Sequence, residues 1–271
     1  MRLATTFDNF RKLALKPNTL LVVYIGAAIF AAIQLISLGT HPYLYPQPPF
    51  PDDIMNKPEN MRQFIGQQLT EYNNYLIFKY SFFNLVKGIN LYGVHASQHW
   101  DFFKYSPTFA LLMAPMAYLP DIIGLSIWNV LNAIAVFYAI RLLPFNIKTQ
   151  SMLMLFVALE LLTSLQNTQS NGLMCGLMIA AYGCMQKDKP IWATLWLVVA
   201  TYIKVYGAIG FCMFLFYPGK LKFILYALLW TVLLGILPLI VTPWATLVWQ
   251  YRNWAELLMA DASSAVGLSV A

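Results

Sequence analysis

Two ionisable side chains, Glu160 and Lys204, lie within apolar segments that suit the interior of a lipid bilayer. A charged group there costs roughly 3 kcal/mol or more, so each one calls for a partner or a function. For Glu160 we expect a neutral or hydrogen-bonded carboxyl packed against another helix. Lys204 divides two half-length apolar segments, where its ammonium either snorkels to the membrane interface or binds a phosphate.

The stretch QNTQSN, residues 166–171, places amides and hydroxyls between two apolar helices, where ordinary loops more often use Gly, Pro or charge. An amide offers both a donor and an acceptor, which suits the recognition of hydroxyl groups. Amides also hold helices together within bilayers, and the residues leave both roles open. The candidate sugar or acceptor ligands of this stretch are Gln166, Asn167, Gln169 and Asn171.

A second polar group, HASQHWD, contains His95, His99 and Asp101. The two histidines have the four-residue spacing of metal ligands on one helix face. Histidines and an aspartate in a wet loop more often form hydrogen bonds, so we predict no metal site and no cofactor here.

The composition requires that membrane helices position these groups. Hydrophobic residues make up 59% of the chain and charged residues 10%, with a mean hydropathy of +0.60, whereas soluble domains have roughly 45–50% and about 25%. The net charge of +6 comes from basic residues spread between apolar runs, which is typical of orientation signals and not of nucleic-acid binding. The cysteines fit no zinc motif, and we expect small buried hydrophobic residues at Cys175, Cys184 and Cys212.

Hydropathy along the chain predicts an all-α, polytopic membrane protein. Residues 1–19 are basic and therefore predicted to be cytoplasmic, and residues 20–38 form a first transmembrane helix. The extracytoplasmic loop 40–106 begins with a proline-rich stretch. Between about Met61 and Val86 it has apolar residues at helical spacing among polar ones, which indicates one or two interfacial helices.

Residues 107–241 carry many apolar segments, predicted to form a transmembrane helical bundle. Basic breaks at 141–148, 187–189 and 220–222 are expected on the cytoplasmic side, which places QNTQSN and Lys204 outside. Two full crossings within 107–140 would reverse this assignment, so we expect one segment there to be re-entrant or interfacial. The last stretch, 242–271, is expected to be an extracytoplasmic, amphipathic segment with a truncated end.

An ordered set of motifs resembles glycosyltransferase family 87, also called the DUF2029 family. The motifs are GINLY (88–92), FKYSPTFALLMAPMAYLP (103–120), WNVLN (128–132), QNTQSN (166–171) and IKVYG (203–207). The resemblance implies a GT-C fold, in which interfacial helices of the first outer loop help to build an extracytoplasmic active site in the cell (inner) membrane. It also implies a polyprenyl-phosphate sugar donor of the mannose type, a lipid or glycan acceptor, and inversion at the anomeric carbon.

The resemblance assigns roles to individual residues, with departures. The family's base is an aspartate fourteen residues before the Gly of G-x-x-L-Y, and Asn74 stands there in this chain. An amide cannot take a proton at neutral pH, so the candidate bases are Asp101 and Glu71. Lys204 and Lys104 are the candidate ligands of the donor phosphate, and Tyr105 is a candidate sugar contact. Gly207 replaces the proline that usually follows K-x-Y, and family members usually continue through several more helices.

Three functions remain open from the sequence. A glycosyltransferase that uses a lipid-linked sugar is the leading interpretation. A non-catalytic membrane protein that binds or moves a lipid-linked sugar is the alternative, which Asn74 favours. An ion-coupled transporter is the third, although Glu160 and Lys204 offer few groups for an ion path and no inverted repeat is visible.

Overall fold

The computed structural model describes residues 16–42, 68–95, 97–99 and 101–268, which fall into two compact units. The first unit takes its described residues from 16–34 and 121–234, and the second from 35–120 and 235–268. The predicted cytoplasmic segment before residue 16 and the first part of the predicted interfacial helices lie outside the described residues.

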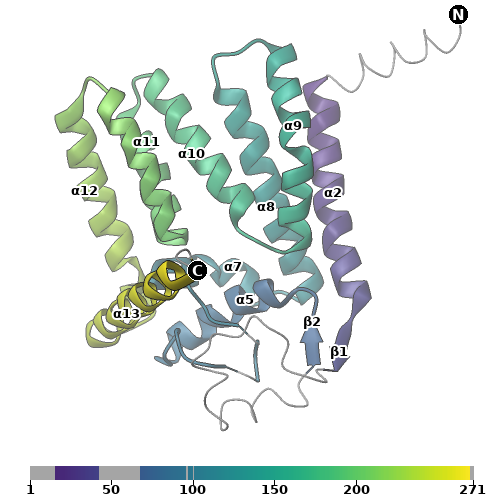
Figure 1. Cartoon of the computed structure of the whole chain (residues 1–271), viewed down its shortest axis with the longest axis vertical. Helices are drawn as coiled ribbons and strands as arrows, with labels where there is room; N and C mark the ends of the chain where they lie inside the picture. The colour runs from purple at the N-terminus through teal and green to yellow at the C-terminus, as the bar shows by residue number, and fades with distance from the viewer. Residues whose placement is uncertain (1–15, 43–67, 96, 100, 269–271) are drawn as a thin grey trace, which may run out of the picture. The chain divides into compact units, whose positions relative to one another are not determined.

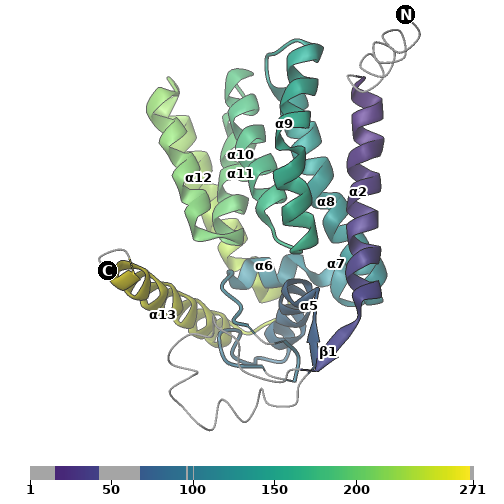
Figure 2. The same ribbon diagram turned by 45° about the vertical axis from the view of Figure 1, so that its right-hand side comes forward.

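The first unit is a bundle of helices that run side by side (Figure 1 and Figure 2). Four described helical stretches are long and apolar enough to cross a membrane: Asn18–Leu38, Asp121–Leu142, Ile147–Gln166 and Lys220–Ile240. The fold is therefore that of an all-α polytopic membrane protein, as predicted. The elements of this unit are α2 (Pro17–Leu38), α8 (Asp121–Leu142), α9 (Ile147–Gln166), α10 (Asn171–Gln186), α11 (Pro190–Ile203), the 3₁₀ helix η1 (Val205–Phe216) and α12 (Lys220–Ile236).

Helices α8 and α10 pack closely and in parallel because α10 presents glycines to α8. A Cβ added at Gly176 would lie 2.6 Å from the carbonyl carbon of Ala135, and one at Gly183 would lie 2.9 Å from the Cβ of Leu142. Gly176 and Gly183 are seven positions apart and so lie on one face of α10, and small residues on one face allow such close backbone approach in membrane helices. The polar residues of α8 are thereby held against the start of α10.

Helix α11 and η1 form a hairpin with Lys204 at its tip. A Cβ at Gly207 would lie 2.5 Å from the carbonyl carbon of Ala200, so the two arms touch directly after the turn. Further along, the hydroxyl of Tyr217 donates to Oδ1 of Asp188 at 2.5 Å. Lys204 itself has an extended backbone, with φ −137° and ψ 129°, which ends α11 and starts the return.

The alternating directions of these helices give the first unit two chemically different ends. One end, which we call the amide end, carries Gln166–Asn171 and Lys204. The opposite end, which we call the basic end, carries Arg141, Lys148, Lys187, Lys189, Lys220 and Lys222. A pairing at each end joins neighbouring elements: Gln166 Nε2 donates to Gln34 Oε1 at 3.4 Å, and Arg141 donates to Gln150 Oε1 at 2.5 Å.

The second unit consists of shorter elements. Strands β1 (Thr40–Pro42) and β2 (Gln68–Thr70) pair antiparallel, with Thr40 opposite Thr70. The predicted interfacial helix begins later than expected, because Leu69 lies in β2 and helix α5 covers Asn73–Val86. The remaining elements are α6 (Pro107–Leu112), α7 (Ala114–Ala117), η2 (Leu237–Ile240) and α13 (Trp244–Leu268).

The region 107–140 contains one helix long enough to cross a membrane. Helices α6 and α7 have only six and four residues, about 9 Å and 6 Å of helix, against a hydrocarbon core about 30 Å thick. Pro107 and Pro115 each occupy the first turn of a short helix, where a missing N–H is tolerated. Helix α8 is thus the one helix of this described region that is long enough for a crossing.

Candidate active site

Lys204 meets the amide-rich loop at the amide end of the first unit. Its Nζ donates hydrogen bonds to Asn171 Oδ1 at 2.9 Å and to Gln169 Oε1 at 3.2 Å. The sequence offers Lys204 and the two amides as separate candidates, and the fold brings them together. Both amide acceptors carry no formal charge, so these two bonds orient the ammonium without cancelling its charge.

The other two amides of QNTQSN make different contacts. Gln166 reaches Gln34 on α2, and Asn167 Nδ2 donates to the carbonyl of Thr163 at 2.9 Å on its own helix. Both residues are exposed. The loop therefore has two pairs of amides. Gln169 and Asn171 contact Lys204, whereas Gln166 and Asn167 lie at the exposed end of α9.

The backbone of this loop is held by a helix-ending motif. The N–H of Thr168 donates to Leu165 O, and the N–H of Gln169 donates to Ser164 O, which is the Schellman pattern. Thr168 has φ +50°, a left-handed conformation that glycine adopts easily and a β-branched residue does not. Trp128 Nε1 donates to the carbonyl of Thr168 at 3.2 Å, so a side chain of α8 holds the turn in place.

The WNVLN motif of α8 positions the loop, a role that the sequence did not reveal. Asn132 Oδ1 accepts the N–H of Leu173 at 2.8 Å and so caps α10 from a neighbouring helix. Asn129 Nδ2 donates to Leu165 O at 3.3 Å and to Ala28 O at 3.4 Å. Two amides three residues apart on a buried helix face indicate hydrogen bonds to neighbouring helices, because a buried amide must find partners.

Two expectations for the first unit are wrong. We expected Glu160 to pack against another helix, but its side chain is exposed and lines a pocket between α9 and α10. Cys175 and Cys212 are also exposed and not buried. On a membrane-spanning bundle the outward surface is apolar too, so hydropathy alone does not separate it from the core.

In the second unit, Lys104 lies beside a carboxylate that the sequence did not suggest. Its Nζ contacts both oxygens of Asp261, at 2.9 Å and 2.8 Å. Asp101 lies close enough to feel both charges, and its Oδ1 accepts the N–H of Phe102 at 2.7 Å. Partial removal from water raises the pKa of Asp101, while the Phe102 hydrogen bond and the charge of Lys104 oppose that rise.

The two histidines of HASQHWD hydrogen-bond to the backbone. His95 Nε2 donates to Asn90 O and His99 Nδ1 donates to Asp101 O, each at 2.7 Å, since a carbonyl can only accept. Burial lowers the pKa of His99 to about 4, so its ring is neutral at physiological pH. Across the described part of the chain, no three His, Cys, Asp or Glu side chains are grouped as metal ligands.

Glu71 and Asn74 lie near the start of α5. Near the end of the same helix, Asn84 Nδ2 donates to Gln98 Oε1. Asn74 and Asn84 are ten positions apart on α5, or about 15 Å along the helix. The ring of Tyr105 is buried and stacks on Phe109, with centroids 4.8 Å apart. Tyr105, a candidate sugar contact, thus belongs to an aromatic cluster.

Helix α13 holds the loop between α5 and α6. Gln250 is fully buried, and its side chain accepts the N–H of Leu91 at 3.1 Å and donates to Ile89 O at 2.6 Å. Trp254 Nε1 donates to Lys104 O at 3.3 Å. GINLY and Lys104 are therefore fixed by a helix that lies far away in the sequence, in a segment expected only to be amphipathic.

The candidate residues thus form two groups. Lys204 and the amides belong to the first unit, whereas the second unit contains Glu71, Asn74, Asp101, Lys104 and Tyr105. Apolar helices long enough to cross a membrane, with a lysine and amides clustered at one end, define a polytopic membrane protein with a polar group at the end of its helices.

Comparison with family models identifies that class further. The model of glycosyltransferase family 87 matches residues 102–270. The match covers more than half of the chain, which therefore belongs to glycosyltransferase family 87 and is a membrane glycosyltransferase. The matched region begins after Asn74 and the GINLY motif and extends through α13. No curated protein and no solved structure matches the chain.

Proposed function

We propose that this protein transfers a hexose, with mannose the expected sugar, from a polyprenyl-phosphate donor to a lipid or glycan acceptor on the extracytoplasmic face of the cell membrane. The observation that carries the proposal is the cluster of Lys204, Gln169 and Asn171. It combines a cation for a phosphate with amides for hydroxyl groups at a single helix break.

A cation near the leaving group favours the reaction because negative charge grows on the phosphate as its bond to the sugar breaks. The Lys204 ammonium is already oriented by two amide oxygens, so little rearrangement is needed when the phosphate arrives. The acceptor oxygen then attacks the anomeric carbon, the bond from that carbon to the phosphate oxygen breaks, and the phosphate leaves with the electron pair.

The distribution of charge supports an extracytoplasmic site. The basic end of the first unit carries six lysines and arginines in its loops and the adjoining helix ends, whereas Lys204 is the basic residue of the amide end. Loops rich in Lys and Arg remain in the cytoplasm. The amide end, at the other side of the crossing helices, is therefore expected outside.

The proton of the acceptor hydroxyl needs a base. Asp101 is the candidate we favour, because its raised pKa brings it closer to the working pH than an ordinary aspartate. Glu71 is the second candidate from the sequence, and Asp261, beside Lys104, joins them as a third carboxylate. We expect the base to be one of these three residues.

A transfer assay tests the proposal. The purified chain in lipid nanodiscs is given polyprenyl-phosphate mannose and a panel of lipid acceptors. We expect Lys204→Ala to lower kcat/KM at least a hundredfold and Lys204→Arg to recover part of it, since arginine keeps the charge. Lys222→Ala at the basic end is the matched control. Full activity of Lys204→Ala would discard the assigned role.

The same assay with Asp101→Asn, Glu71→Gln and Asp261→Asn identifies the base. Substitution of the base should lower kcat with little change in KM. A second function, binding or carriage of a lipid-linked sugar without transfer, is favoured by Asn74 at the position where the family has an aspartate. Donor binding with no transfer to any acceptor would support that second function.

A further inference from the structure

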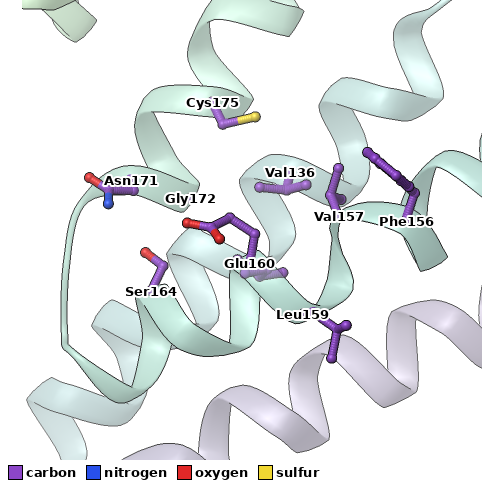
Figure 3. A pocket seen from close by; sticks show the side chains of 10 residues that line it. Val136, Phe156, Val157, Leu159, Glu160, Ser164, Asn171, Gly172 and Cys175 are labelled. Carbon is purple, nitrogen blue, oxygen red and sulfur yellow. The ribbon is translucent and has the colours of Figure 1, made fainter.

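A pocket of about 400 Å³ lies within the first unit between α9 and α10, next to α8 (Figure 3). This volume is in the range of small-molecule sites. Its lining includes Phe156, Leu159, Glu160, Ser164 and Asn171.

One side of the pocket is lined by exposed apolar side chains. Phe156 and Leu159 are 84% and 78% exposed on α9, which is one of the membrane-crossing helices. Large apolar side chains in that position face the hydrocarbon of the bilayer. A hydrocarbon chain can therefore enter the pocket sideways without crossing water.

The end of the pocket nearest the amide end is polar. Glu160 and Ser164 are four residues apart on α9 and share a face, and Figure 3 shows the Glu160 carboxylate pointing toward the side that carries Ser164 and Asn171. Ser164 is 5% exposed, and within the described structure its Oγ has no hydrogen-bond partner. A buried hydroxyl left in this state costs roughly 1–3 kcal/mol, which a ligand group can recover.

The polar groups at this end select the kind of ligand. A carboxyl oxygen of Glu160 accepts hydrogen bonds, and Ser164 and Asn171 can donate and accept. A hydroxyl group satisfies all three, whereas none of the described residues that line the pocket is a Lys or Arg that could bind a phosphate. The pocket thus fits a neutral, hydroxyl-bearing head attached to a hydrocarbon chain.

We propose that this pocket binds the acceptor of the reaction, a membrane lipid whose head carries a free hydroxyl bound by Glu160 and Ser164. This inference rests on the proposed function. It also explains why Asn171 belongs to both sites: its side chain lines the pocket, and its Oδ1 accepts the bond from Lys204. A donor phosphate at Lys204 then lies next to the acceptor head.

Photolabelling tests the inference without relying on transfer. The full chain in nanodiscs is irradiated with a diacylglycerol that carries a diazirine in one acyl chain, and the labelled peptides are mapped by mass spectrometry. Unlabelled diacylglycerol, its O-methyl ether and phosphatidic acid compete separately. We expect label on α9 and α10, displaced at least tenfold better by diacylglycerol than by the other two lipids.

Variants assign the effect to the polar end. Glu160→Leu and the smaller change Ser164→Ala should each lower the labelling at least fivefold, while Glu160→Gln keeps part of it because an amide oxygen still accepts. Glu256→Gln, an exposed carboxylate of the second unit, is the matched control and should label normally.

Equal competition by the O-methyl ether would overturn the proposal by reducing the pocket to a hydrocarbon groove. Better competition by phosphatidic acid, or labelling that falls as protein concentration rises because a second copy covers the face, would overturn it too. Hydroxyl-dependent labelling in a chain that transfers no sugar would reject the transferase proposal and retain a lipid site.

Discussion

Lys104 and Asp261 lie 157 positions apart in the sequence and form an ion pair in which one ammonium contacts both carboxylate oxygens, at 2.8 Å and 2.9 Å. The two side chains remain 40% and 45% exposed, so the pair contributes only about 0–1 kcal/mol to stability. Asp261 also neutralises the charge of Lys104, which we propose as a ligand of the donor phosphate.

The first prediction concerns this pair. Asp261→Asn should release the charge of Lys104 and lower the KM for the donor severalfold, whereas Lys104→Ala should raise it, with thermal midpoints within about 2 °C of the wild type. Steady-state kinetics in nanodiscs measure both effects. An unchanged KM in both variants would remove Lys104 from the donor site, and a collapse of kcat in Asp261→Asn would make Asp261 the base.

The second prediction concerns Gln250, which binds the backbone of the GINLY motif. Gln250→Ala should lower the free energy of unfolding by about 1–3 kcal/mol, because the buried N–H of Leu91 loses its acceptor. Thermal unfolding in detergent measures it. Asn253→Ala removes only a bond to Trp249 O within the same helix and should change stability by about 0.5 kcal/mol or less. Equal effects would contradict the assigned role.

The third prediction tests the contact between α8 and α10. Gly176→Ala places a Cβ 2.6 Å from the carbonyl carbon of Ala135 and should destabilise the bundle by about 1–3 kcal/mol. Gly26→Ala on α2 is the matched control, since a Cβ there meets nothing within 4 Å and alanine favours helix. A Gly176→Ala protein as stable as the control would show that the helices are further apart.

The fourth prediction concerns pH. His99 has a pKa lowered to about 4 by burial, against about 6.5 in an unfolded chain. Above pH 6.5 the His99 ring is neutral in both the folded and the unfolded protein, so the titration of His99 costs no stability there. As the pH falls from 6.5 to 4 only the unfolded state gains the proton, so the folded protein loses up to about 3 kcal/mol.

Thermal midpoints measured between pH 7.5 and pH 4.5 check this dependence. His99→Asn keeps a donor for the carbonyl of Asp101 but cannot titrate, so its midpoint should fall less over that range. An equally steep fall in the variant would assign the pH dependence to other groups.

The sequence was most informative where hydropathy and charge act over short distances. The basic breaks and the half-length apolar segments around Lys204 predicted that QNTQSN and Lys204 share one end of the helices, and the hydrogen bonds to Gln169 and Asn171 agree with this. Such contacts follow from the direction of each helix, which the lengths of the apolar runs determine.

Contacts between distant segments could not be predicted. Nothing near Lys104 indicates Asp261, and nothing in GINLY indicates Gln250, because both partners come from α13. The exposed position of Glu160 was missed for a different reason. The inner and outer faces of a membrane helix are both apolar, so helical periodicity carries little information about which face is buried.

The three neighbouring elements α10, α11 and η1 are short, with 16, 14 and 12 residues, or about 24, 21 and 24 Å of rise. The hydrocarbon core of a bilayer is about 30 Å thick. A bilayer adapts to helices this short by becoming locally thinner, or water reaches inward to their ends. We therefore expect Lys204, at the tip of the hairpin, to be hydrated within the protein, where the proposed donor phosphate can approach it from the plane of the membrane.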